Sequence, residues 1–176
     1  MGYKAMKEMK QDILKDLARV MYGDIELPIK ELDTDDLFYT WRWSTTRYKP
    51  GKLVKPVFVP VSDLMGKTIS SIRGAVKDND VILFECTDGS MYLMWHEQDC
   101  CECVDIDDIC GDINRLIGTP ITKAEEVTDS YGDCDNDESY TWTFYHFATV
   151  KGYVTLKWYG SSNGYYSESV DFCKIK

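Results

Sequence analysis

Two absences limit where this protein can act. The sequence has no run of about 18 uncharged apolar residues, which excludes a membrane-spanning helix of ordinary length. Its first residues, MGYKAMKEMKQD, lack the apolar core of a secretory signal peptide. We therefore expect a soluble protein that stays in the cytoplasm of the cell that makes it.

Positive charge is scarce outside the N-terminal third of the chain. The 176 residues include 20 Lys and Arg against 30 Asp and Glu, which gives a net charge of −10. Residues 1–60 hold 11 basic and 9 acidic side chains, so residues 61–176 hold 9 basic and 21 acidic ones. Such an acidic field repels nucleic acid, and it favours cations or partners with basic surfaces.

The composition excludes wholesale disorder. Hydrophobic residues make up 44% of the chain and aromatic residues 13%, enough to build the core of one ordinary domain. Residues 4–22 place apolar side chains at helical spacing, which predicts an amphipathic helix whose apolar face packs on the body. Prolines interrupt residues 24–60. We place a boundary near Pro60, between an N-terminal segment (1–60) and a main domain (61–176).

Most of the main domain has the sequence pattern of β-strands. Asp88-Gly89 predicts a hairpin turn between two of them, and a β-meander with aromatic residues on both faces is predicted for the C-terminal third. The stretch DDICGDINRLIG predicts a helix of one or two turns. The expected fold is therefore α+β, with an antiparallel sheet, an N-terminal amphipathic helix and a short helix after the cysteine-rich segment. The predicted strands are 68–76, 81–87, 90–96, 100–106, 121–130, 140–150, 153–160 and 165–175.

A cysteine-rich segment lies in the middle of the chain. Seven cysteines without a signal peptide argue against a disulfide framework. The sequence from His96 to Cys103, HEQDCCEC, supplies the imidazole and thiol donors that zinc takes in a tetrahedral structural site. Cys100 and Cys103 have the spacing of half a zinc knuckle, whereas strand alternation would put Cys101 and Cys103 on one face. No standard zinc-finger pattern is completed, so reduced, half-buried cysteines are the alternative.

Other chemistries have less support from the residues. A catalytic zinc needs an open position and a general base, and the H-x-E and P-C-x-x-C pattern of deaminases is absent. A nucleophilic Cys100 or Cys101 activated by His96 or His146 is disfavoured, because the acidic neighbours raise a thiol pKa. Residues 133–138, DCDNDE, lack the spacing of a calcium-binding loop.

Two aromatic segments suit contact with another protein. Residues 37–62 contain five basic and no acidic side chains, interleaved with aromatic residues, and we favour packing or protein contact there over nucleic-acid binding. Residues 158–167, WYGSSNGYYS, predict a hairpin turn that presents Tyr165 and Tyr166, for which core packing is the alternative.

Five motifs between Val61 and Phe172 carry a family resemblance: GKTISSIRG, HEQDCCECVDIDDICGD, LIGTPITKAEE, ESYTWTFYHFATVKG and WYGSSNGYYSESV. Together they resemble a family of small domains of unknown function that phages and mobile elements encode. At least one protein that resembles this pattern is a zinc-containing inhibitor of the type II CRISPR nuclease. The resemblance therefore implies an anti-CRISPR protein, at work in the cytoplasm of a bacterial host, with a structural zinc. It implies as ligands His96, Cys100 and Cys101, completed by Cys103, Cys110 or Asp112.

The leading expectation is a non-enzymatic inhibitor of the type II CRISPR effector nuclease. Its acidic surface would dock on a basic surface of the nuclease and block the loading of target DNA. Aromatic side chains would supply much of the affinity. The first alternative is a phage regulatory protein that binds another host factor, and a zinc-dependent hydrolase is a further alternative.

Overall fold

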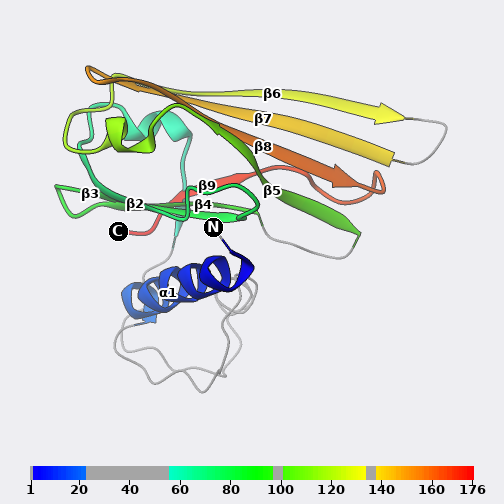
Figure 1. Ribbon diagram of the computed structural model, residues 1–176, viewed down its shortest axis with the longest axis horizontal. Helices are drawn as coiled ribbons and strands as arrows, with labels where there is room; N and C mark the ends of the chain where they lie inside the picture. The colour runs from blue at the N-terminus through cyan, green and yellow to red at the C-terminus, as the bar shows by residue number, and fades with distance from the viewer. Residues whose placement is uncertain (1, 23–55, 97–100, 134–137) are drawn as a thin grey trace.

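The computed structural model describes residues 2–22, 56–96, 101–133 and 138–176, which form stacked layers (Figure 1). Within these residues, nine strands make two antiparallel sheets, and the helix α1 (Tyr3–Tyr22) lies against the first sheet. The five-stranded sheet has the order β1-β9-β4-β3-β2, with strands β1 (Val57–Phe58), β2 (Ile69–Arg73), β3 (Val81–Cys86), β4 (Met91–Trp95) and β9 (Asp171–Lys174). The four-stranded sheet has the order β5-β8-β7-β6, with strands β5 (Glu102–Cys110), β6 (Lys123–Asp133), β7 (Glu138–Thr149) and β8 (Gly152–Ser162).

The predicted α+β class is wrong, because the described part of the chain is mostly β. Besides α1, its helical structure consists of two 3-10 helices of four residues each, η1 (Val61–Leu64) and η2 (Ile113–Leu116). The predicted meander of 140–150, 153–160 and 165–175 is correct for its first two strands, which form the antiparallel pair β7 and β8. Its third strand is wrong, because β9 pairs with β4 in the other sheet, and β6 takes the place beside β7. The protein is therefore a two-sheet structure with a single α-helix among its described residues.

The short helix predicted for residues 107–118, after the cysteine-rich segment, is wrong in its extent, because the structure has there only the 3-10 helix η2. Residues 107–110 continue β5, and after an irregularity at Asp107 the strand pairs with β8 from Asp108 to Cys110, so the sheet satisfies backbone hydrogen bonds there. A glycine then ends the strand. Gly111 has a φ of 106°, and a Cβ at this position would lie 2.7 Å from the carbonyl oxygen of Tyr153.

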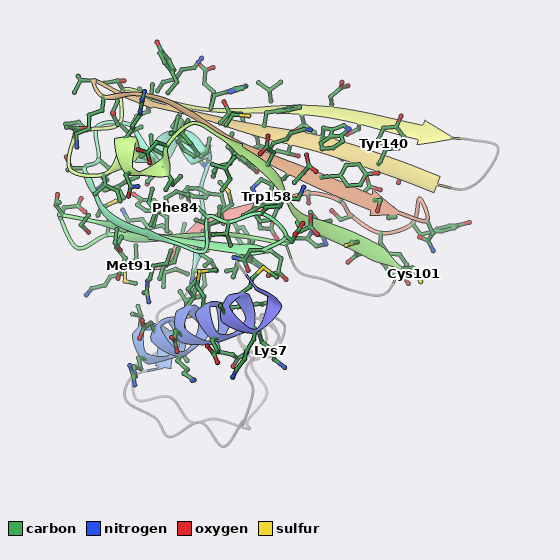
Figure 2. All side chains as sticks on the ribbon, in the orientation of Figure 1. Lys7, Phe84, Met91, Cys101, Tyr140 and Trp158 are labelled. Atoms are coloured by element: carbon green, nitrogen blue, oxygen red, sulfur yellow. The ribbon has the colours of Figure 1, made fainter. Side chains whose placement is uncertain are left out.

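The core between the two sheets is built from alternate residues of the facing strands. In β8, Val154, Leu156 and Trp158 are buried, whereas the residues between them are partly exposed. They share one core with Phe84 and Phe147, whose ring centroids are 6.0 Å apart. Phe84 and Trp158 can be seen between the sheets in Figure 2. This burial of every second residue is typical of a strand with one solvated face.

The helix α1 covers the opposite face of the five-stranded sheet. Its buried side chains Ile13, Leu14, Leu17, Ala18 and Met21 pack on Val81, Leu83, Leu93, Trp95, Cys173 and Ile175. Because β3 is then covered on both faces, its sequence VILFEC is apolar at almost every position. The predicted N-terminal helix and the packing of its apolar face are confirmed, while the domain boundary near Pro60 stays a prediction. No helix in the described ranges has the length and apolar character needed to cross a membrane.

The four-stranded sheet carries no further layer of described residues on its outer face. Its strands β6, β7 and β8 run past the end of the five-stranded sheet (Figure 1). Along β8, Tyr153, Thr155, Lys157 and Tyr159 alternate with the buried residues and face outward. One broad sheet surface therefore lies opposite the core, and the candidate site is built on it.

Candidate functional site

His96, the predicted histidine ligand, is buried and both of its ring nitrogens have partners. Its side chain is 4% exposed. Nδ1 lies 2.7 Å from the carbonyl oxygen of Ser169, and Nε2 lies 3.3 Å from Oε1 of Glu102. A carbonyl oxygen only accepts hydrogen bonds, so Nδ1 is the donor, and Nε2 faces a carboxylate. Neither nitrogen has a described cysteine as its partner.

The predicted structural zinc is wrong. Within the described ranges, no group of three or more His, Cys, Asp or Glu side chains is arranged to hold a metal ion. Cys101 and Cys103 are exposed, whereas His96 is buried against Glu102. Cys100 lies outside the described residues. Among the described donors, residues close in sequence therefore lie in different surroundings, buried for His96 and exposed for the two cysteines.

The two alternative ligands, Cys110 and Asp112, have other roles. Oδ1 of Asp112 accepts a hydrogen bond from the backbone N–H of Asn114 at 3.0 Å and caps η2. The hydrogen bond from Cys110 to Asp108 raises the pKa of that thiol, and partial desolvation, followed by the charge of Asp105, raises the pKa of the Cys103 thiol. Because the thiolate is the reactive and metal-binding form, both shifts disfavour nucleophilic chemistry and metal binding at these positions.

The outer face of the four-stranded sheet places aromatic and acidic side chains in rows across the strands. Asp105 of β5 is opposite Tyr159 of β8, which is opposite Trp142 of β7. In the next row, Lys157 of β8 is opposite Phe144 of β7. We call this surface the aromatic–acidic face, and its central residues are Asp105, Asp107, Tyr140, Trp142, Phe144, Lys157 and Tyr159.

The aromatic side chains of this face are held by one lysine and by one another. The rings of Trp142 and Tyr159 have centroids 4.4 Å apart, and Tyr140 lies 6.5 Å from Tyr159. Nζ of Lys157 lies 3.9 Å from the centroid of Trp142 and 2.9 Å from Oδ2 of Asp107. This combination of cation–π and ionic contacts orders the rings before any partner arrives.

The acidic side chains at the β5 edge of the face repel one another. Burial, followed by the charges of Asp78, Asp80 and Asp107, raises the pKa of Asp105. Asp107 behaves in the opposite way, because its hydrogen bond to Lys157 lowers its pKa. The carboxylate of Asp105 is thus held in a negative field, and a cationic group placed beside it would relieve that repulsion.

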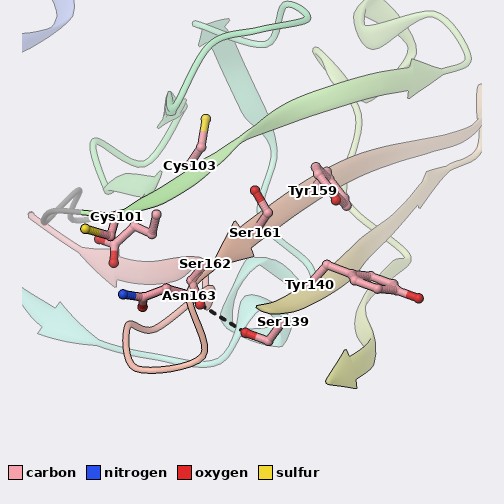
Figure 3. A pocket seen from close by; sticks show the side chains of 9 residues that line it. Cys101, Cys103, Ser139, Tyr140, Tyr159, Ser161, Ser162 and Asn163 are labelled. Atoms are coloured by element: carbon pink, nitrogen blue, oxygen red, sulfur yellow. Dashed lines mark hydrogen bonds between the residues drawn. The ribbon is translucent and has the colours of Figure 1, made fainter. Parts of the chain in front are cut away.

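A shallow pocket of about 520 Å³ lies at the end of this face where β5 and β7 begin and β8 ends (Figure 3). Hydroxyl groups dominate it, and Oγ of Ser139 lies 3.0 Å from Oγ of Ser162. It contains the exposed cysteines of the predicted metal site, beside polar groups that suit hydrogen bonding to a partner's side chain. The lining residues are Cys101, Glu102, Cys103, Ser139, Tyr140, Tyr159, Ser161, Ser162 and Asn163.

The sequence predicts aromatic residues on both faces of the meander without indicating which face is buried. In β7, Tyr145 and Phe147 lie in the core, whereas Trp142 and Phe144 lie on the outer face. The sequence of β5 could have identified the outer face, because Asp105 and Asp107 alternate with apolar residues and are therefore expected on the face away from the core.

The two aromatic segments predicted for protein contact are described only in part. The turn residue Tyr165 is 84% exposed, and most of the basic segment 37–62 lies outside the described residues.

The fold and the face together define a two-sheet β protein with a half-buried aromatic and acidic surface on one outer face. Residues 62–172 match the model of a domain of unknown function, DUF7448. The match covers more than half of the chain, and the protein belongs to this family. The predicted membership of an uncharacterised family from about Val61 to Phe172 is therefore confirmed. No curated protein and no solved structure matches the chain.

Proposed function

We propose that this protein is a non-enzymatic inhibitor that binds another protein through the aromatic–acidic face. The proposed partner is the type II CRISPR effector nuclease, and the proposed effect is to block the loading of target DNA. One observation carries the proposal: Trp142 and Tyr159 form a ring cluster beside the carboxylates of β5 on a solvent-facing sheet.

The aromatic residues suit a binding role because they are large and already ordered. Trp and Tyr are enriched among the residues that dominate the energy of protein interfaces. Here Lys157 lies over the Trp142 ring at 3.9 Å, so little side-chain freedom remains to be lost when a partner packs on it.

The charge of the face suits a partner with a basic surface. Proteins that bind nucleic acid present Lys and Arg to the phosphates, and a nuclease channel has this character. Asp105 and Asp107 would attract such a channel and accelerate the encounter. The resemblance in the five motifs supports the choice of the type II nuclease among basic partners.

A DNA-cleavage assay with the purified, guide-loaded nuclease tests the proposal. We expect the wild-type protein to inhibit cleavage when it is added before the DNA and to lose its effect when it is added after. The double variant Trp142→Ala, Tyr159→Ala should need at least about tenfold more protein for the same inhibition, because two central anchors are lost.

Val150→Ala is the control, because it trims an exposed apolar side chain of the turn between β7 and β8, outside the face. It should inhibit as well as the wild type. Full inhibition by the Trp142 and Tyr159 double variant would place the binding surface elsewhere. If the wild type fails to inhibit and instead binds another host protein through this face, the nuclease is rejected and the regulatory alternative is supported.

A further inference from the structure

The strand β6 forms one edge of the four-stranded sheet, next to the aromatic–acidic face. Among the described strands, β7 is its sole neighbour. The side chains of residues 125–130 are all exposed, and Val127 is 50% exposed. An edge strand has backbone N–H and C=O groups on its outer side that another strand can pair with.

The edge of β6 is long and regular, whereas the opposite edge is not. Pairing with β7 runs without a register shift from Lys123 opposite Ala148 to Asp133 opposite Glu138. At the other edge, β5 has an irregularity between Ile106 and Asp108. Bulges of this kind hinder the addition of a strand, so β6 is the better template of the two.

The side chains of β6 select the strand that could pair with it. Glu125, Val127 and Asp129 are opposite His146, Phe144 and Trp142 of β7, so they share the outer face of the sheet. Along the edge, this face therefore shows one apolar residue between two acidic ones. Glu125 has an ion pair with Lys123 at 2.9 Å between exposed side chains, which contributes little and can open.

We propose that the edge of β6 binds an extended, basic segment of a partner protein, which pairs with it as an added fifth strand. In antiparallel register, the two basic residues of such a segment lie opposite Glu125 and Asp129, and the apolar residue between them lies opposite Val127. Backbone hydrogen bonds then supply affinity, and the charge pairs fix the register. The bound segment would extend the aromatic–acidic face, since Asp129 is opposite Trp142.

A second copy of this chain fits the same edge poorly. If two β6 strands paired antiparallel around Val127, Glu125 of each copy would lie opposite Asp129 of the other. Like charges directly opposite one another destabilise a strand pair. The acidic side chains therefore protect this edge against self-association and leave it open to a basic strand.

This inference goes beyond the proposed function, because the edge would bind such a segment whichever protein carries it. The probe is a capped peptide with Lys, Val and Lys at alternate positions and Thr between them, titrated by calorimetry into the full-length protein. A second peptide of identical sequence carries N-methyl groups on alternate amides, which removes the ladder hydrogen bonds. We expect the first peptide to bind and the second to bind at least about tenfold more weakly.

The protein variant for this test is the double change Glu125→Lys, Asp129→Lys, with the double change Glu8→Lys, Asp12→Lys on α1 as the control matched in charge. The β6 variant should bind the first peptide at least about tenfold more weakly, while the control should bind it unchanged. Both sites are exposed, so both variants should keep the melting temperature of the wild type within a few degrees.

Three results would overturn the inference. The first is no binding of the unmodified peptide, and the second is equal binding of the N-methylated peptide, which would indicate side-chain attraction without strand pairing. The third is a concentration-dependent dimer that Val127→Lys abolishes, which would assign the edge to a second copy. The nuclease assay and the peptide titration together separate the two proposals: inhibition that the Trp142 and Tyr159 variant loses, with no binding of the unmodified peptide, leaves only the proposed function standing. Peptide binding without nuclease inhibition leaves only the edge site.

Discussion

The two sheets of this protein differ in how much of each is covered. The five-stranded sheet lies between α1 and the other sheet, so its strand β3 is apolar at almost every position. The four-stranded sheet is covered on its inner face, and its strand β8 alternates strictly between buried and partly exposed residues. The five-stranded sheet is therefore buried on both faces, whereas the four-stranded sheet also presents the aromatic–acidic face, for which we propose a role in binding.

The largest expected effect is the difference in stability loss between the two tryptophans of the four-stranded sheet. Trp158 is 1% exposed in the inter-sheet core, and Trp158→Ala should lower the free energy of unfolding by about 3–5 kcal/mol. Trp142→Ala on the outer face should lower it by less than about 1 kcal/mol. Urea unfolding measures both. Equal losses would mean that the outer face is part of the structural core, and the comparison would fail.

The next effect concerns the contact between the sheets at His96. This residue directly follows β4, and its partner Glu102 begins β5, so their interaction joins the two sheets. Removing one member of such a buried pair is costly, and His96→Ala should lower the free energy of unfolding by about 3 kcal/mol.

A metal chelator distinguishes this role from a zinc ligand. Because the imidazole binds a carboxylate and a carbonyl oxygen, the melting temperature of the wild type should not change in the chelator. A fall of several degrees on chelation, with zinc released, would restore the metal site.

A smaller effect is expected where α1 covers the five-stranded sheet. Leu17 is fully buried against this sheet, and Leu17→Ala should lower the free energy of unfolding by about 2–3 kcal/mol. Lys15→Ala, on the exposed side of the same helix, is the control and should change it by less than about 0.5 kcal/mol. If Leu17→Ala has no effect on urea unfolding, the helix does not contribute to the stability of this sheet.

The smallest expected effect is on the pH dependence of stability, and it should have opposite signs for Asp105 and Asp107. The raised pKa of Asp105 means that the folded protein binds this proton more tightly than the unfolded chain. Stability is therefore lost as pH rises from the ordinary carboxyl pKa, about 4, through the raised value. Asp105→Asn removes that loss, so its melting temperature should exceed that of the wild type at pH 7. The difference should shrink as pH falls below about 4.

Asp107→Asn is the matched comparison, because Lys157 lowers the pKa of Asp107. A lowered pKa contributes stability above the ordinary carboxyl pKa, so this variant should melt below the wild type at pH 7. Thermal unfolding between pH 3 and pH 8 measures both variants. Shifts of the same sign would show that Lys157 does not distinguish the two carboxylates. We also expect Asp105→Asn to weaken partner binding, which would separate stability from recognition at one residue.

Much of the fold could be predicted because local patterns and tertiary packing agree. The turn at Asp88-Gly89 joins β3 and β4, and the hairpin of β7 and β8 has the predicted turn at Lys151-Gly152. The strand predicted for 165–175 was assigned to the wrong sheet, because β9 pairs with the distant strand β4 and not with β8. The short helix was overestimated because Ile109, Ile113 and Leu116 have helical spacing. Pairing of β5 with β8 prevailed over this local pattern as far as Cys110.

The candidate site could be predicted only in part, because its geometry depends on distant contacts. Spacing placed His96 near the cysteines, but its Nδ1 partner is Ser169, 73 residues away in sequence. Aromatic residues at both odd and even positions of β7 leave two orientations open from sequence. The orientation is decided by the packing of Tyr145 and Phe147 on the other sheet.

The alternation of β8 has a consequence for how this protein can evolve. Its even-numbered residues from Val154 to Ser162 face inward, and its odd-numbered residues from Tyr153 to Ser161 face outward. Substitutions at the odd positions can change the chemistry of the proposed binding surface while the even positions preserve the fold. A deletion of a single residue within the strand would exchange the two sets, so β8 can accept many substitutions but almost no change of length.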